Sequence, residues 1–231
     1  MVWNDRTVRF RLAIASLLVF VLVTVLVGVH WSPVARLDRA ISAWARRFGG
    51  AHPSWIDAWG VITHTGDTLP LSVLGGAAII LLLVSRRPLD AATVLVVAVV
   101  VQVITLGIRI LLARHRPVDP FTPTSGLSYP SGHTLHSTVA VLLAVHLLKN
   151  DPQRRAVAWL LGSFAGLIGV SRVLLLAHWP TDVVGGWLLA LGLGLLLPDV
   201  IATVAERRTP SRPPPSPAGP HTPEGPAPPS R

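Results

Sequence analysis

The 231-residue chain contains no cysteine, and only 13% of its residues are charged. The absence of cysteine excludes disulfides, iron–sulfur clusters and thiolate zinc sites. Soluble proteins average roughly 25% charged residues, so this fraction argues against an ordinary soluble domain, while 51% hydrophobic residues argue against a mostly disordered chain. In a soluble protein the formal charge of +9 would suggest a nucleic acid partner. Here the charges lie between long apolar runs, so we expect no nucleic acid partner and interpret them as signals of membrane orientation and of an anionic ligand.

Six apolar runs predict membrane-spanning helices, because a helix crosses the hydrocarbon core with about 20 mostly apolar residues. The first run continues into His30, Trp31 and Pro33 without a small-residue cleavage site, so we interpret it as a retained helix rather than a signal peptide. The fold class is therefore predicted to be all-α: a polytopic membrane protein with six transmembrane helices in a bundle. The six runs are Leu12–Val29, Leu69–Val84, Ala91–Ile108, Thr134–Leu148, Ala156–Val170 and Val183–Leu197.

Glycines inside these runs are expected to allow close contacts between helices in lipid. Six of them fit this role: Gly75, Gly76, Gly162, Gly166, Gly185 and Gly186.

Two further segments fall outside the predicted bundle. Between the first two runs, apolar residues recur at helical spacing with arginines interleaved, which predicts an amphipathic helix on the outer membrane surface; a connecting loop with some helix is the alternative. From residue 209 onward the chain has ten prolines in 23 residues, so we predict a disordered tail at 209–231 beyond a membrane domain at 1–208. The amphipathic pattern consists of Val34, Leu37, Ile41, Trp44 and Phe48 with Arg36, Arg39, Arg46 and Arg47.

The distribution of basic residues predicts the orientation in the membrane. If the N-terminus lies inside, inner segments hold 12 of the 20 basic residues and outer segments hold eight. Because cytoplasmic loops carry an excess of Lys and Arg, this count predicts that both termini are cytoplasmic.

Polar residues gather at three places, each at the predicted outer end of a run. The first is RILLARHRP, residues 109–117, in which Arg109 and Arg116 are two helical turns apart and would share a face if the helix persisted, although Pro117 disfavours helix there. Arg114 is expected only to snorkel to the interface. The second is YPSGH, residues 129–133, where a turn opens a helix and its free N–H groups favour an anion.

The third cluster is SRVLLLAHWPTD, residues 171–182. His178 and Asp182 are four residues apart, and a carboxylate within reach of a histidine fixes its tautomer and makes the other ring nitrogen a better base or nucleophile. Arg172 interrupts an otherwise apolar run, and Pro180 suits the first turn of the sixth helix. All three clusters map to one side of the bilayer and together predict an oxyanion site with two histidines.

These segments resemble the tripartite signature KxxxxxxRP, PSGH and SRxxxxxHxxxD of the type 2 phosphatidic acid phosphatase (PAP2) superfamily, including its bacterial membrane lipid phosphatases. The resemblance implies that His178 is the nucleophile that forms a phosphohistidine, that Asp182 orients it, and that His133 transfers protons. It also implies that the phosphoryl oxygens are held by Arg109, Arg116, Ser131, Gly132 and Arg172. One departure is Arg109, which replaces the signature lysine and keeps the charge but not the geometry.

The resemblance further implies a metal-independent hydrolase of a lipid phosphate or diphosphate, with the site on the extracytoplasmic side. His133 and His136 have HxxH spacing, but no outer carboxylate lies near in sequence, so we expect no metal and no cofactor. Candidate substrates are phosphatidic acid, phosphatidylglycerol phosphate and undecaprenyl diphosphate. The alternatives are a phosphoryl or headgroup transferase on the same site, a haloperoxidase-like activity, which six spans disfavour, and a non-catalytic transporter or scaffold.

Overall fold

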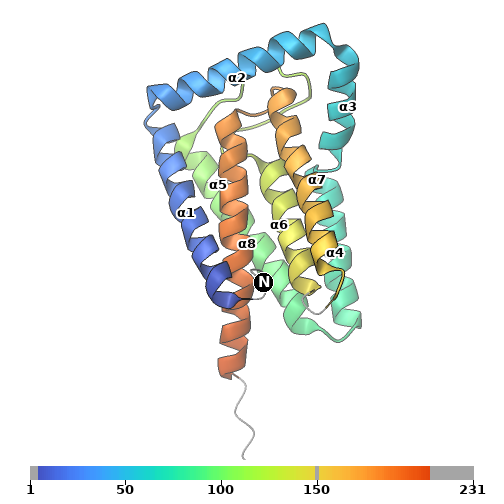
Figure 1. The fold of residues 1–231 in the computed structure, drawn as a ribbon. Helices are drawn as coiled ribbons and strands as arrows, with labels where there is room; N and C mark the ends of the chain where they lie inside the picture. Colours follow the sequence, from blue (N-terminus) through green and yellow to red (C-terminus); the bar gives the residue numbers. More distant parts are fainter. Residues whose placement is uncertain (1–4, 149–150, 209–231) are drawn as a thin grey trace, which may run out of the picture.

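The computed structural model describes residues 5–148 and 151–208, and within these ranges the chain is helical with no β-strand (Figure 1). The helices are connected by short turns except for a long irregular segment at residues 113–131. In chain order they are α1 (Arg6–Gly28), α2 (Ser32–Ala51), α3 (Pro53–His64), α4 (Thr68–Val84), α5 (Pro88–Leu112), α6 (Gly132–Leu147), α7 (Arg154–Leu174) and α8 (Pro180–Arg208). The prediction of an all-α chain is confirmed.

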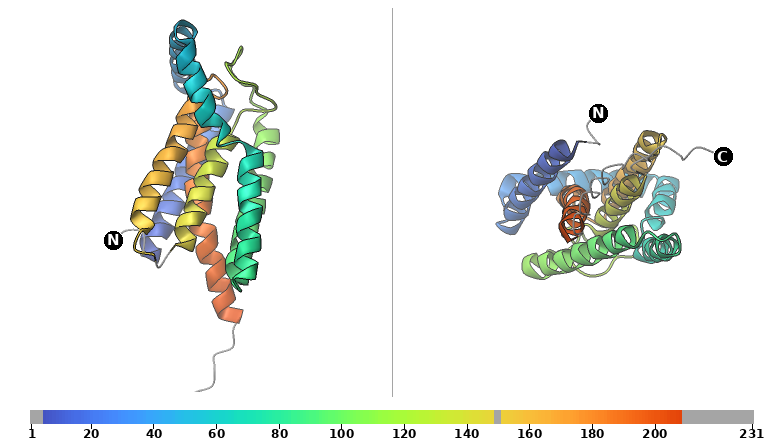
Figure 2. Two further views of the ribbon diagram at one scale, coloured as in Figure 1. Left: turned by 90° about the vertical axis from the view of Figure 1, so that its right-hand side faces the viewer. Right: turned by 90° about the horizontal axis from the view of Figure 1, so that it is seen from below.

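Helices α1 and α4–α8 run lengthwise through one bundle, and α8 packs against α1, α5 and α6 (Figures 1 and 2). The core between them is apolar and includes Phe20, Val97, Val101, Leu135 and Leu189, all nearly inaccessible. Large apolar side chains also cover the outside of the bundle. Exposing so many of them to water would be unfavourable, whereas contact with lipid would not be.

Five helical segments are long and apolar enough to cross a membrane, judged by length and composition within the described ranges. They are Arg6–Gly28, Pro53–Val84 (which joins α3 and α4), Pro88–Leu112, Arg154–Leu174 and Pro180–Arg207. The predicted fourth span corresponds to α6, which has 16 residues and is shorter than the others. Several membrane-spanning helices are thus confirmed, and a count of six stays a prediction.

Local sequence signals account for several helix ends. Proline occupies the first turn of α2, α3, α5 and α8, where its missing N–H costs nothing. Helix α5 ends at Leu112 because Ala113 adopts a left-handed conformation with φ of 45°. The helix therefore does not persist to Arg116, as Pro117 indicated, and Arg109 and Arg116 do not share a helical face.

Helix α2 crosses one end of the bundle, where the sequence predicted an amphipathic helix (Figure 1). Its buried side consists of Asp38, Ser42, Ala45 and Gly49, whereas predicted apolar positions such as Trp44 are about half exposed. The helical periodicity is confirmed, but the side of α2 that faces the bundle is polar and small. Helix α3, which was not predicted, follows α2 and packs against α7.

The start of α1 and the end of α8 lie at the same end of the bundle, opposite α2 (Figures 1 and 2). Because the helices alternate in direction, the 113–131 segment, the start of α6 and the α7–α8 turn all lie at the α2 end. The predicted disordered tail, 209–231, lies outside the described residues.

The predicted role of the glycines holds for only some of them. A Cβ on Gly185 would lie 2.7 Å from the Tyr129 hydroxyl oxygen, and one on Gly186 would lie 2.9 Å from the Ser131 carbonyl oxygen. A Cβ on Gly162 would meet nothing within 4 Å, and the same holds for Gly75, Gly76 and Gly166. Of the six predicted glycines, the two that are closely packed therefore lie where α8 passes the turn that opens α6.

We predict that Gly186→Ala destabilises the protein by about 1–3 kcal/mol, because the new methyl group meets a backbone oxygen that cannot move without shifting α6. Gly162→Ala is the matched control, since both substitutions gain the same helix propensity of about 1 kcal/mol and only Gly186 is crowded. Thermal unfolding of the detergent-solubilised variants measures the difference. Equal unfolding midpoints for the two variants would contradict the packing described here.

Candidate active site

The predicted site residues come from four helices and two connections, and all lie at the α2 end of the bundle. Arg109 is in the last turn of α5, and Arg116 is in the irregular segment after it. His133 is in the first turn of α6, Arg172 is in the last turn of α7, and His178 lies between α7 and α8. Asp182 is in the first turn of α8, and Ser131 and Gly132 precede His133.

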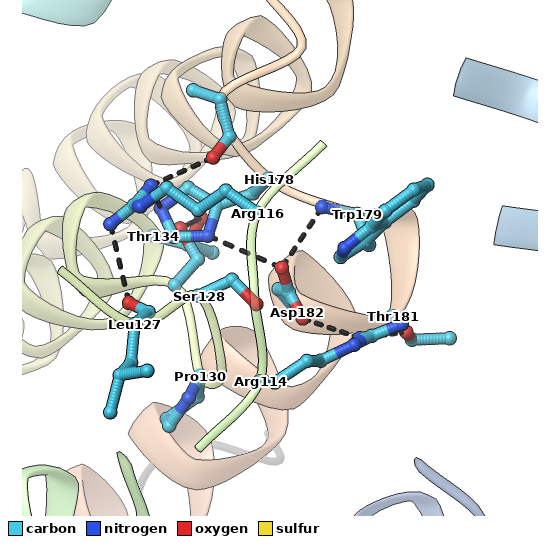
Figure 3. A network of polar contacts seen from close by, with 12 residues as sticks. Arg114, Arg116, Leu127, Ser128, Pro130, Thr134, His178, Trp179, Thr181 and Asp182 are labelled. Carbon is cyan, nitrogen blue, oxygen red and sulfur yellow. Dashed lines mark hydrogen bonds and ion pairs between the residues drawn. The ribbon is translucent and has the colours of Figure 1, made fainter. Parts of the chain in front are cut away.

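His178 is buried, with 1% of its surface exposed, and both of its ring nitrogens face charged groups (Figure 3). Its Nε2 lies 2.9 Å from Nη1 of Arg116, and its Nδ1 lies 3.4 Å from Oδ2 of Asp182. Because a guanidinium can only donate, Nε2 must carry a lone pair and the proton of a neutral ring must be on Nδ1. Burial lowers the pKa of His178 to about 4, against the opposing effect of Asp182, so the ring is neutral near pH 7. This is the protonation state that a histidine nucleophile needs.

Asp182 is fully buried and connects all three sequence clusters (Figure 3). Its Oδ1 accepts from Nη1 of Arg114 at 2.5 Å, and its Oδ2 accepts from the amide of Trp179 at 2.9 Å. Its main-chain carbonyl accepts from the amide of Ser131 at 3.0 Å. The Nδ1 of His178, in contrast, is buried without a hydrogen bond, so the contact with Asp182 is electrostatic in this geometry.

The expectation that Arg114 merely snorkels to the interface is wrong. Its guanidinium bridges two buried carboxylates, because Nη2 also donates to Oδ2 of Asp38 at 2.6 Å. Asp38 in turn accepts from the amide of Thr181 at 3.0 Å and from its hydroxyl at 2.6 Å. Sequence spacing gave no signal for this connection, because Asp38 and Thr181 are 143 residues apart. The contact between Asp38 and Thr181 attaches the polar side of α2 to the start of α8.

Three guanidinium groups, on Arg109, Arg116 and Arg172, converge on the site without a carboxylate partner. Among the described residues none of them lies within 4.0 Å of a carboxylate oxygen, although Arg172 is only 4% exposed. The buried Nε atoms of Arg109 and Arg172 have no hydrogen-bond partner. Burying such charges is costly unless an anion compensates them, so this arrangement of arginines can hold an anion.

The contacts that these arginines do make are with neutral oxygens. Arg116 donates to the carbonyl groups of Gly126, Leu127 and Ala177, which fix its guanidinium beside His178. Arg109 donates to the Pro130 carbonyl, and Arg172 donates to the Thr63 hydroxyl at 2.7 Å. Burial lowers the pKa of Arg116, with a further contribution from the neighbouring Arg109, although both groups remain charged at neutral pH.

Ser131 and Gly132 open α6 beside these arginines. The Ser131 side chain is fully buried, and its Oγ accepts from the Thr134 hydroxyl at 3.0 Å. The Ser131 amide donates to the main-chain carbonyl oxygen of Asp182. A Cβ on Gly132 would lie 2.7 Å from Nη2 of Arg109, so only glycine lets that guanidinium approach the start of α6. Phosphate binding by the Ser131 hydroxyl and the Gly132 amide stays a prediction.

His133 has a partner that the sequence analysis missed. Its Nε2 lies 2.7 Å from Oδ1 of Asp67, in the turn between α3 and α4. No motif includes Asp67, and its only local signal is that of a residue preceding a helix. Within residues 5–148 and 151–208, no group of three His, Asp or Glu side chains is placed to hold a metal ion.

The fold and this arrangement define a class: a bundle of apolar helices that holds two imidazoles and three arginines at one end. Comparison with known proteins gives the family. A model of the PAP2 superfamily matches residues 90–205, and the chain is 31% identical over 192 residues to phosphatidylglycerophosphatase B of Bacillus subtilis, covering 79% of this chain and 89% of that one. The chain belongs to the PAP2 superfamily and is a hydrolase of that type, as its signature predicted.

Other similarities agree with this assignment. The undecaprenyl-diphosphatase of Sulfolobus acidocaldarius is 33% identical over 132 residues, which covers 53% of this chain and 61% of that one. The crystal structure of a transmembrane PAP2 type phosphatidylglycerolphosphate phosphatase from Bacillus subtilis superposes with a TM-score of 0.69 at 28% identity, covering 87% of this chain and 98% of that one. Aquifex aeolicus LpxE, at 18% identity and a TM-score of 0.55, covers 75% of this chain and 96% of that one and shares the fold.

We predict that Asp38→Asn destabilises the protein by at least about 2 kcal/mol. Removing one partner of a buried ion pair typically costs ~3–5 kcal/mol, and the expected loss is smaller here because Arg114 retains its ion pair with Asp182. The matched control is Asp119→Asn, which removes a surface ion pair with Arg46 in which the Asp119 side chain is 88% exposed, and which should change stability by less than about 1 kcal/mol. Thermal or denaturant unfolding in detergent compares them. A control that is as destabilised as Asp38→Asn would refute the structural role of the Arg114 bridge.

Proposed function

We propose that the protein is a membrane lipid phosphatase that hydrolyses a phosphomonoester or diphosphate through a phosphohistidine on His178, without a metal ion. The single observation that carries the proposal is the uncompensated charge of Arg109, Arg116 and Arg172 around a neutral, buried imidazole. A phosphate group supplies the missing negative charge, and arginine binds its oxygens in pairs.

The proposed first step is attack of the His178 Nε2 lone pair on phosphorus. Arg116 donates to that lone pair in this structure. A phosphate oxygen must therefore replace Nε2 as the acceptor of the Arg116 N–H before the attack. The proton on Nδ1 faces Asp182, whose negative charge stabilises the positive ring that forms. The guanidinium groups stabilise the charge that accumulates on the phosphoryl oxygens in the transition state.

His133 is the proposed proton donor and acceptor. It protonates the leaving oxygen as the bond from phosphorus to that oxygen breaks, and it then takes a proton from the water that attacks the phosphohistidine. Hydrolysis of the phosphorus–nitrogen bond releases inorganic phosphate and restores neutral His178.

The proposed orientation places the termini in the cytoplasm and the site on the opposite face, with six spans that include α6 and with α2 at the interface. The basic residues support it. At the α2 end, four of the eight arginines are used in or beside the site, which leaves Arg36, Arg39, Arg46 and Arg47. The opposite end carries Arg6, Arg9, Arg11, Arg86, Arg87, Arg154, Arg155 and Arg207, and this excess is typical of a cytoplasmic face.

The proposed substrate has a phosphate at headgroup level, because the site lies at the ends of the helices rather than at mid-membrane. The names of two relatives, phosphatidylglycerophosphatase B and undecaprenyl-diphosphatase, support a glycerophospholipid phosphate and a polyprenyl diphosphate as the two substrate classes. A transferase that passes the phosphoryl group to an acceptor other than water uses the same residues and is the second candidate.

We predict that His178→Ala abolishes phosphate release, with a loss of at least about 10⁴-fold in kcat, because the variant lacks the Nε2 lone pair that lies beside Arg116 and is the proposed nucleophile. Wild-type protein quenched during turnover of a ³²P-labelled substrate should carry an acid-labile, base-stable label that the variant lacks. His115→Ala is the matched control, because His115 is exposed, lies next to Arg116 on the 113–131 segment and occupies a variable position of the signature.

Comparable release by His178→Ala would contradict the assigned nucleophile. Activity that is lost with a chelator and restored by zinc would contradict the metal-free mechanism. Transfer of label to an alcohol in preference to water would favour the transferase.

A substrate panel separates the two lipid classes. We predict that purified protein releases phosphate both from phosphatidylglycerol phosphate and from an isoprenoid diphosphate, because the proposed arginine contacts are to the phosphoryl group that both lipids share. The kcat/KM values for these two lipids and for phosphatidate identify the preferred class. Release from a soluble sugar phosphate at a similar kcat/KM would contradict a lipid substrate.

A further inference from the structure

The turn between α3 and α4 carries an acidic residue that contacts the site from outside the signature. Asp67 directly precedes α4, yet its carboxylate does not bond to the free amides of that helix, as an aspartate at this position usually does. Oδ1 accepts instead from Nε2 of His133 at 2.7 Å, and Oδ2 accepts from Nδ1 of His64 at 3.0 Å. The carboxylate therefore gives up a favourable local contact for one with a residue 66 positions away.

The same turn is fixed against the bundle by packing. Helix α3 packs against α7, and Gly66 is buried so closely that a Cβ there would lie 2.7 Å from the Ile168 side chain. One turn earlier, Thr63 accepts from Arg172. This segment thus contacts two site residues, although it precedes the region, 90–205, that matches the family.

We propose that Asp67 is a positioning residue that fixes the tautomer and the orientation of His133 for proton transfer; this inference rests on the proposed function. A carboxylate that accepts from Nε2–H leaves Nδ1 as the nitrogen that exchanges a proton with the reacting groups. Among the described residues, Nδ1 of His133 has no hydrogen-bond partner, so it is available for that exchange.

The Asp67 carboxylate also supplies a negative charge that stabilises the protonated ring of His133 during the two proton transfers. Once the phosphate dianion is bound, the cycle requires His133 as an imidazolium, which gives its Nδ1 proton to the leaving oxygen as the His178 nitrogen bonds to phosphorus. In the second step neutral His133 takes a proton from the attacking water, so the imidazolium is restored and no further acid is consumed. Burial disfavours this positive ring most, and Arg172 and Arg116 add to that effect, whereas the Asp67 carboxylate opposes it. The negative charge of an entering phosphate acts in the same direction as Asp67.

The dependence on the leaving group tests the proposal. An alkyl phosphate must have its leaving oxygen protonated, whereas p-nitrophenyl phosphate leaves as a stable phenolate. We expect Asp67→Asn to lower kcat/KM for an alkyl phosphate monoester at least about tenfold more than for p-nitrophenyl phosphate, as a fraction of the ~10²–10⁴-fold that acid–base catalysis contributes. His133→Ala should show the same selectivity with a larger amplitude.

The matched control is Asp57→Asn, an exposed carboxylate on α3, which should leave both kcat/KM values within about twofold of the wild type. The ratio of the two values from one preparation does not depend on how much of the variant is folded. An equal loss on both substrates would reduce Asp67 to a structural role, and an unchanged or increased rate on the alkyl substrate would also overturn the proposal. Failure of wild-type protein to form the phosphohistidine would instead refute the proposed function.

Discussion

A buried carboxylate needs donors for its oxygens, and the three signature segments of this protein meet on one such group, Asp182. Its side chain accepts from Arg114 and from the Trp179 amide, and its main-chain carbonyl accepts from Ser131. Removing two charges from water costs several kcal/mol for each ion unless the geometry is satisfied, so this arrangement constrains where α5, α6 and α8 can end. The same constraint places His178 beside the Asp182 carboxylate.

The site combines a compensated group of charges with an uncompensated one. Asp38, Arg114 and Asp182 compensate one another and carry a net negative charge next to His178. Arg109, Arg116 and Arg172 bond to neutral oxygens and have no carboxylate partner among the described residues. The first group suits the positive charge that develops on a phosphorylated imidazole, and the second suits the phosphoryl oxygens. One end of the bundle therefore provides for both charges of the proposed intermediate.

Helices α2 and α3 extend the site beyond the signature. Asp38 connects α2 to the carboxylate that faces the proposed nucleophile, and Asp67 connects the α3–α4 turn to the proposed proton-transfer histidine. Each of the two imidazoles thus has a carboxylate at one nitrogen, one within the signature and one outside it. Helix α2 crosses the end of the bundle with Trp44 about half exposed, so the segment nearest the proposed membrane interface is also attached to the reacting groups.

The sequence by itself determined the apolar helices, the polar end of the bundle and the residues that meet there, because hydrophobic periodicity and short motifs are local properties of the chain. It also predicted α2 from its spacing, but not which side faces the bundle. Only the tertiary structure decided the partners of Arg114, His133 and Arg172, since Asp38, Asp67 and Thr63 are far from them in sequence. Such pairs follow from how helices pack across the bundle. An aspartate on an interfacial helix has the same local pattern whether it faces water or a buried guanidinium, so its role became visible only in the fold.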